Sequence, residues 1–231
     1  MKKIKISSEL NYILAILILS LSVAMISCTD FGLSMIVAPA YILSQKLTFL
    51  TFGQSEYAVQ GVLIVLFCIL MRRVKPIYFT SFGTGLIYGA VLDLWRWVIP
   101  HFNPEITPPG SLPFPLRAVY FVVGMLMTSF SIAMFFRTYF YPQVYDFFVK
   151  GVSARYGLDR NKFKICYDAS FLAISCAMSL ILFRRFVGVG VGTLIMTACN
   201  GLLIGAFGKF LDRFFVFEPR FPKFSRYFDI L

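Results

Sequence analysis

The chain has 231 residues, of which 58% are hydrophobic and only 14% are charged. A soluble domain of this length carries a more polar surface, so the composition excludes an ordinary soluble protein and favours a multispanning membrane protein. The formal net charge of +11 would suggest a nucleic-acid partner in a soluble protein. In a membrane protein the positions of the charges matter more than their sum, and we predict no nucleic-acid partner.

Six apolar stretches have about the length that crosses a bilayer core. They lie at residues 10–30, 54–71, 77–98, 115–136, 165–183 and 188–212. With both termini on one side, 17 of the 22 Lys and Arg residues fall in segments on that side. Because cytoplasmic segments carry an excess of Lys and Arg, the pattern predicts that both termini are cytoplasmic.

The first stretch also resembles a signal peptide that ends in a lipoprotein-type cysteine. Three lysines precede an apolar run, and Cys28 follows it. Met25 is a poor residue for the third position before such a cysteine, and no soluble domain follows. We therefore favour a first membrane span.

Cysteine and histidine give no sign of a metal, cofactor or catalytic site. The five cysteines form no CxxC pair, and we interpret them as small packing residues. The single histidine, His101, lies in a predicted outer loop. Without a Ser/His/Asp set or an HExxH motif, the chain is predicted not to be an enzyme.

The second half of the chain repeats the layout of the first. Residues 56–73 and 168–185 each begin with an acidic residue, continue with an apolar run and end with Arg-Arg. Residues 85–90 read Gly-Leu-Ile-Tyr-Gly-Ala, and residues 201–206 read Gly-Leu-Leu-Ile-Gly-Ala. Three spans in each half would invert the second half relative to the first. Such inverted repeats are typical of secondary transporters.

Each half also contains an apolar segment that is broken by a lone proline. Pro39 interrupts residues 31–50, and Pro142 interrupts residues 134–149. A proline inside a helix removes a hydrogen bond and bends or ends the helix. Interrupted segments at matching positions in the two halves favour a transporter site. The equal alternative is that each segment forms an amphipathic helix at the membrane–water interface.

The predicted fold is therefore all-α, with six transmembrane helices in two inverted three-helix repeats. The repeats occupy residues 1–98 and 115–213. Residues 99–114 form a proline-rich outer linker without a helix of its own, because six of the eleven prolines lie between residues 98 and 115. Residues 214–231 interleave aromatic and basic residues, which is typical of a tail in the lipid headgroup layer.

Small and polar residues of the third and sixth spans form the candidate substrate site. Pairs of glycines four positions apart let helix backbones approach closely, so we expect these two spans to form the central pair. An amide within a membrane is costly unless it is hydrogen-bonded, which makes the mid-span Asn200 the strongest candidate. The candidate substrate-binding residues are Asn200, Gly201, Thr193, Thr197, Gly85 and Thr84.

Three acidic residues are candidates for gating or for carrying protons. Glu56 and Asp168 hold equivalent positions in the two halves, and Gln60 lies one turn after Glu56 on the same helical face. Asp93 falls late in the third span. Ionisable groups inside a membrane are functional candidates, although an acid near a helix end can also serve as a solvated cap.

Several segments of the chain are similar to bacterial membrane proteins of the YitT/YczE type. The similar segments are residues 31–41, 52–57, 86–93, 148–153, 190–193 and 200–205. The resemblance implies a bacterial plasma-membrane protein with five or six spans. It implies no catalytic or ligand-binding residues, because no activity is established for that family as a whole.

These observations leave two functions open. The first is a small secondary transporter or permease for a polar, including anionic, small metabolite, which would bind between the halves. The second is a non-transporting accessory or scaffold protein of a membrane or envelope complex, with a protein partner or a second copy as its ligand. The basic loop 150–164 and the tail would then form the partner surface. A channel is a third and weaker alternative.

Overall fold

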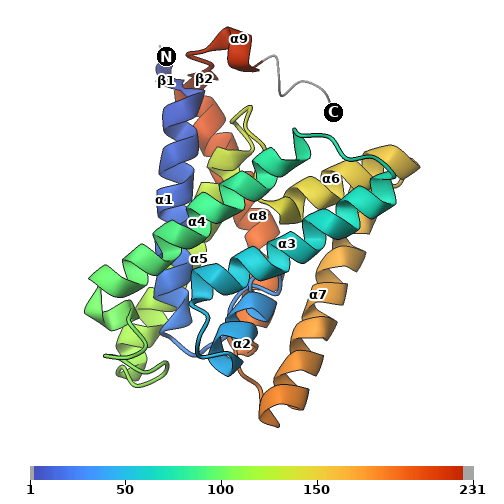
Figure 1. Ribbon diagram of the computed structural model, residues 1–231. Helices are drawn as coiled ribbons and strands as arrows, with labels where there is room; N and C mark the ends of the chain where they lie inside the picture. Colours follow the sequence, from blue (N-terminus) through green and yellow to red (C-terminus); the bar gives the residue numbers. More distant parts are fainter. Residues whose placement is uncertain (1–2, 226–231) are drawn as a thin grey trace.

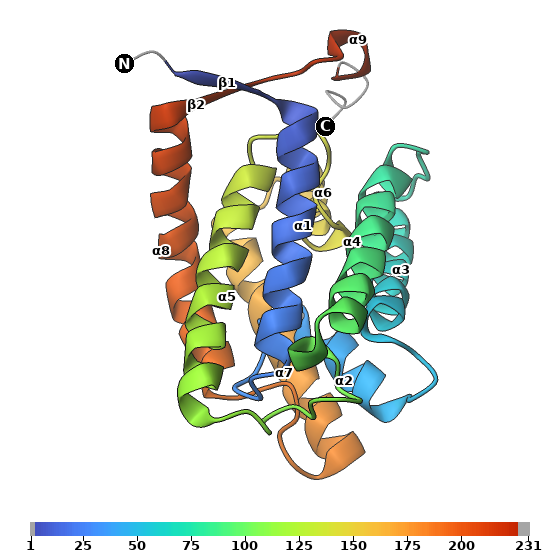
Figure 2. The same ribbon diagram turned by 90° about the vertical axis from the view of Figure 1, so that its left-hand side faces the viewer.

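The protein is described here over residues 3–225 by a computed structural model (Figures 1 and 2). Long helices make up most of this region, and two short strands join its ends. The helices are α1 (Ser8–Ser27), α2 (Ala38–Lys46), α3 (Phe52–Met71), α4 (Tyr78–Val98), α5 (Phe114–Phe135), α6 (Val144–Tyr156), α7 (Arg160–Phe183), α8 (Val191–Phe214) and α9 (Pro222–Ser225). The strands are β1 (Ile4–Ser7) and β2 (Phe215–Glu218), and η1 (Pro100–Phe102) is a 3-10 turn.

Five of these helices, α1, α3, α5, α7 and α8, are long and apolar enough to cross a membrane. The α4 helix has 21 residues but lies outside this set, and it carries the charged residues Asp93 and Arg96. Together the six helices coincide with the six apolar stretches of the sequence. The protein is thus an α-helical protein of membrane type.

The two proline-broken segments form short helices rather than kinked extensions of long ones. Pro39 lies in the first turn of α2, where its missing N–H costs no helical hydrogen bond. Pro142 precedes α6 and lies in the connection that follows α5. In Figure 1, α2 and α6 lie toward opposite ends of the molecule. The prolines therefore separate these short helices from the long ones instead of bending a continuous helix.

The centre of the molecule is the pair α1 and α5, which pack along each other. Our expectation that the third and sixth spans form the central pair was wrong. The α4 helix packs on α1 and α3, and α8 packs on α5, so α4 and α8 lie on opposite sides of the central pair. Glycine pairs indicate a close helix contact but do not identify the partner, which explains the error.

The predicted linker packs against the helix ends rather than lying free. It contains η1, and Phe102 of that turn is buried. His101 Nδ1 lies 2.8 Å from the hydroxyl of Tyr120 on α5. The expectation that this segment lacks helical structure was therefore wrong for one short turn, which Phe102 holds against the apolar core.

Both ends of the described chain meet at one end of the molecule, where β1 pairs with β2 in parallel. Lys5 and Glu218 form an exposed ion pair of 2.9 Å across the two strands. The carboxylate of Glu9 accepts hydrogen bonds from the backbone N–H groups of Arg220 and Phe221. The first part of the predicted tail is thus ordered against the N-terminal segment. Residues 226–231 of the predicted tail lie outside the described residues.

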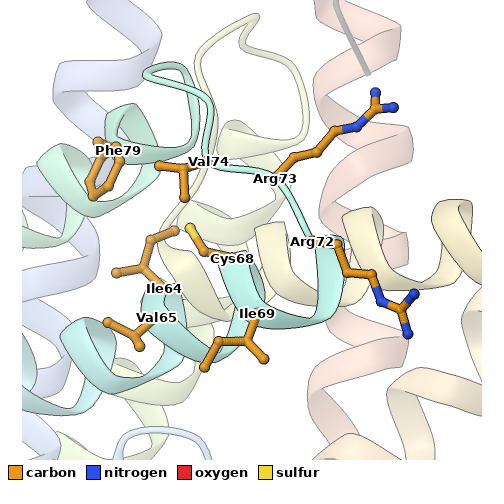
Figure 3. A pocket seen from close by; sticks show the side chains of 8 residues that line it. All are labelled: Ile64, Val65, Cys68, Ile69, Arg72, Arg73, Val74 and Phe79. Atoms are coloured by element: carbon orange, nitrogen blue, oxygen red, sulfur yellow. The ribbon is translucent and has the colours of Figure 1, made fainter.

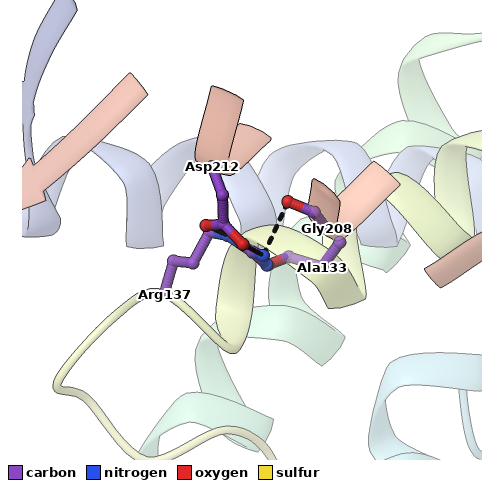
Figure 4. Close-up of polar contacts among 4 residues, drawn as sticks. All are labelled: Ala133, Arg137, Gly208 and Asp212. Atoms are coloured by element: carbon purple, nitrogen blue, oxygen red, sulfur yellow. Dashed lines mark hydrogen bonds and ion pairs between the residues drawn. The ribbon is translucent and has the colours of Figure 1, made fainter. Parts of the chain in front are cut away.

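A hydrogen-bonded arginine fixes the end of α5 to the last turn of α8 at the same end of the molecule (Figure 4). Nε and Nη2 of Arg137 donate to the two carboxylate oxygens of Asp212 at 2.7 and 2.6 Å. The same guanidinium donates to the carbonyl oxygens of Ala133 and Gly208, each at 2.7 Å. Four donor contacts of this kind hold the α5–α8 pair in register.

Candidate functional site

Glu56 lies in the second turn of α3, and no part of it is exposed. The start of this helix is fixed by a capping box, in which Thr51 and Gln54 satisfy each other's backbone N–H groups. Gln60 follows Glu56 by four residues, so both side chains project from the same face of α3 toward α6. The helix thus presents a carboxyl group and an amide together in the interior.

The partners of Glu56 come from both halves of the chain. The hydroxyl of Tyr145 on α6 donates to Oε2 of Glu56 at 2.8 Å. Nε2 of Gln60 donates to the same oxygen at 3.1 Å and lies 3.4 Å from Oε1 of Gln143. Within residues 3–225, no basic side chain takes part in this network. The carboxyl group is therefore buried among neutral polar groups.

Several buried atoms of this network have no hydrogen-bond partner among the described residues. They are Oε1 of Glu56, Oε1 of Gln60, Nε2 of Gln143 and the hydroxyl of Tyr88. A buried polar atom without a partner costs free energy, and most buried polar atoms in proteins are paired. Four such atoms close together indicate a site that can bind a polar group.

A cavity of about 80 Å³ lies beside this network, between the two halves. Its apolar walls come from α1, from residues 33–37 before α2 and from α5, and Met196 of α8 also lines it. The polar part of its lining contains Tyr88 from α4, together with Gln143, Tyr145 and Asp146 at the start of α6. A volume of this size holds several water molecules or one very small solute.

The structure does not bring Asn200 to this cavity. Its Oδ1 accepts a hydrogen bond of 3.2 Å from Ser129 at the contact between α8 and α5. Thr193 is buried, and its hydroxyl accepts from the backbone N–H of Gly190 at the start of α8. Thr197 donates to the carbonyl oxygen of Thr193 at 2.7 Å. These three residues are thus engaged within α8 and with its neighbours.

The glycine pairs of the two halves have different surroundings. A side chain at Gly85 would meet the amide of Gln60, so this glycine makes room for the polar network. A side chain at Gly201 would meet nothing within 4 Å. The hydroxyl of Thr84 lies 2.8 Å from the hydroxyl of Tyr12 and donates to the carbonyl oxygen of Tyr141.

The other two candidate acids have partners of their own. Asp168 and Asp146 both contact the ammonium group of Lys164, at 3.0 and 3.5 Å, where α6 meets α7. The carboxylate of Asp93 accepts hydrogen bonds from the hydroxyl of Thr51 and from the backbone N–H of Gly53 at the start of α3. Asp93 therefore caps α3. Glu56 alone of the three candidate acids lacks a cation or a helix end as its partner.

Sequence reasoning missed the contacts of Glu56 and Gln60 with the second half. Gln143, which lies near Gln60, directly follows the proline that interrupts this half, and Tyr145, the partner of Glu56, comes two residues later. That signal marked the segment but did not identify its contact. The contact arises because α6 packs on α3 of the other half.

A family profile matches residues 6–209, and its family is described as a family of unknown function, DUF6198. The match covers most of the chain, so the protein belongs to this family. No curated protein matches the chain, and no solved structure matches it.

Proposed function

We propose that this member of a family of unknown function is a small secondary transporter of a bacterial plasma membrane, with a polar, including anionic, small metabolite as its substrate. The observation that carries the proposal is the position of Glu56. This carboxyl group is fully buried, lacks a cation, and is hydrogen-bonded to a residue of the opposite half beside a cavity between the halves. An ionisable group in such a place is a functional candidate.

Glu56 has the chemistry of a proton carrier in this proposal. Tyr145 and Gln60 both donate to Oε2, which leaves Oε1 free to hold a proton or to accept a hydrogen bond from a substrate. An ionised carboxylate is expensive to bury without a cation, so proton binding and substrate binding at this site are coupled. The substrate would contact Tyr88 and Gln143 with its polar groups.

Two inverted repeats, residues 1–98 and 115–213, would provide the moving parts, and the helix contacts support this division. The α1 helix packs on α4 as α5 packs on α8, and α3 packs on α6 as α7 packs on α2. The helices α3 and α7 both end at an arginine with left-handed backbone, Arg72 and Arg184. These matched features are what two copies of one unit would produce.

Two contacts of α4, with α3 and with α6, have no comparable counterpart at α8 among the described residues. The α3 helix packs along α4, whereas α7 and α8 make no comparable contact within residues 3–225. In a transporter of inverted repeats, the two halves exchange conformations as the site opens to one side and then to the other. We infer that the difference between the two halves corresponds to one state of such a cycle.

Spin-label distances test this exchange, and the repeat supplies matched positions. Labels at Val62 and Leu86 report on the α3–α4 contact, and labels at Ile174 and Leu202 report on the separation of α7 and α8. All four side chains are exposed. The native cysteines are first replaced by serine or alanine. On a change of pH or on ligand binding, the two distances are expected to change in opposite directions. Fixed distances under all conditions would contradict alternating access.

The site itself is tested by a thermal-stability screen of the purified protein against a metabolite library at several pH values. A ligand that binds the folded state at 100 times its dissociation constant stabilises it by about 2.7 kcal/mol. A hit should be lost in Glu56→Gln and kept in Asn200→Leu if the site is the cavity beside Glu56. If the ligand no longer stabilises Asn200→Leu but still stabilises Glu56→Gln, the binding site lies at α8, as the sequence suggested.

The second candidate function is that of a non-transporting accessory or scaffold protein. The small volume of the cavity favours it, because about 80 Å³ admits little more than water in the present conformation. The similarity of several segments to YitT/YczE-type proteins is compatible with both functions. If no metabolite binds and the label distances stay fixed, the scaffold function is preferred. Its partner surface would be the tail together with the basic segment 150–164, which the structure forms from the end of α6, a short connection and the start of α7 rather than from a loop.

A cytoplasmic location of both termini belongs to either proposal. The strand pair β1–β2 and the connection 72–77 lie at the same end of the molecule in both views. Most basic residues of the sequence fall on that side when six helices cross the membrane. Catalysis, metals and cofactors play no part in either proposal.

A further inference from the structure

A groove of about 480 Å³ lies between the last turns of α3 and the start of α4 (Figure 3). Apolar side chains form most of its lining, and two arginines stand at its end. The lining residues are Ile64, Val65, Cys68, Ile69, Arg72, Arg73, Val74 and Phe79. No acidic residue lines this groove, so its charge is entirely positive.

Several apolar side chains of the groove are largely exposed, whereas Ile64 is buried. Val65, Ile69 and Val74 are 58%, 64% and 69% exposed. In a membrane protein such side chains face hydrocarbon. An acyl chain lying along α3 would cover them and contact Phe79 on the other wall, as the arrangement in Figure 3 indicates.

Arg72 and Arg73 are both exposed, and within residues 3–225 neither side chain forms an ion pair or a hydrogen bond. Arg137 differs, because all its donor groups are engaged by Asp212 and by carbonyl oxygens. A guanidinium group matches a phosphate with two parallel hydrogen bonds. The two arginines therefore have unused capacity for a phosphate.

We propose that this groove binds an anionic glycerophospholipid, with its phosphate against Arg72 and Arg73 and an acyl chain along the apolar wall of α3. Apolar contact beside paired cations at the boundary of a span selects a lipid over a free anion, because a free anion leaves the apolar wall uncovered. The connection 72–77 lies on the basic side of the molecule. Anionic lipids of the cytoplasmic leaflet interact with such basic segments.

The repeat provides a matched control at the opposite end of the molecule. Arg184 and Arg185 follow α7 as Arg72 and Arg73 follow α3. The double variant Arg184→Gln/Arg185→Gln thus removes the same charge from the chain without touching the groove.

Native mass spectrometry of the full-length purified protein measures the binding directly. The probes are phosphatidylglycerol and phosphatidylcholine with identical acyl chains, and glycerol phosphate as the headgroup without chains. Wild type is expected to bind phosphatidylglycerol at least tenfold more tightly than phosphatidylcholine. Arg72→Gln/Arg73→Gln should remove this preference, Arg72→Lys/Arg73→Lys should keep most of it, and the control at 184 and 185 should keep all of it.

Three results would overturn the proposal. They are equal binding of the two lipids by wild type, equal loss in both glutamine double variants, or glycerol phosphate binding as tightly as the lipid. The groove is tested separately by Cys68→Phe, which fills its wall and should weaken phosphatidylglycerol binding while the arginines remain. An unchanged affinity in that variant would also refute the site. Circular dichroism and the melting temperature verify that each variant is folded.

Discussion

Replacing Gly89 by alanine tests a close contact between α4 and α3. A methyl group at this position would meet the ring of Tyr57 and would lie 2.9 Å from the carbonyl oxygen of Gly53 on α3. The ring edge can move, but the backbone of α3 can yield only if the whole helix shifts. Overpacking of this kind costs typically about 1–3 kcal/mol. We therefore expect Gly89→Ala to destabilise the protein.

The equivalent glycine of the second half makes this prediction quantitative. Gly205 lies in α8 as Gly89 lies in α4, and an alanine at Gly205 would meet nothing within 4 Å. Both substitutions gain about 1 kcal/mol of helix propensity, so this contribution cancels when the two variants are compared. The difference between them therefore reports the helix contact alone. Gly89→Ala should be less stable than Gly205→Ala by about 1–3 kcal/mol.

Unfolding by sodium dodecyl sulfate in mixed micelles, followed by circular dichroism, measures this difference. If neither variant is less stable than wild type, the close approach of α3 and α4 is refuted. If both variants lose the same stability relative to wild type, another helix or a second copy covers Gly205 in solution. That result would also weaken the inference that α7 and α8 stand apart.

Three further substitutions test the polar contacts by the same unfolding assay. Tyr145→Phe removes the hydroxyl that donates to Glu56 and should cost about 1–2 kcal/mol, whereas no change would mean that this bond is absent in solution. Arg137→Gln should cost a similar amount, about 1–2 kcal/mol, mainly through its bonds to carbonyl oxygens, because the partner carboxylate of Asp212 is 64% exposed. Lys5→Ala breaks an exposed ion pair and should change stability by less than about 0.5 kcal/mol; a larger loss would indicate that the strand pair depends on it.

The positions of the long helices follow directly from hydropathy. Each of the six apolar stretches corresponds to one helix, because a span must satisfy its backbone hydrogen bonds internally and keep apolar side chains outside. The association of Glu56 with Gln60 was also predictable, since residues four apart share one helical face. Both inferences rest on local periodicity, which a single sequence contains.

The contacts between helices were not predictable in the same way. A glycine pair indicates that some helix approaches, and the sequence motif is the same at Gly85 and Gly201 although only the first is covered. The mid-span Asn200 likewise needs a hydrogen-bond partner, and Ser129 on the neighbouring α5 supplies one. Which helix becomes the neighbour depends on packing between segments that are distant in the sequence. A local sequence pattern does not determine this packing.

The distribution of the polar network between the halves links the fold to the proposed transport. Glu56 and Gln60 belong to the first half, and Tyr145 and Gln143 belong to the second. A proton or a ligand that changes the hydrogen bonds of Glu56 therefore changes the force that holds the halves together. A ligand can shift a conformational equilibrium only by its different affinity for the two states. Because α6 reaches from one half onto α3 of the other, this site is where such a difference in affinity would act on both halves at once.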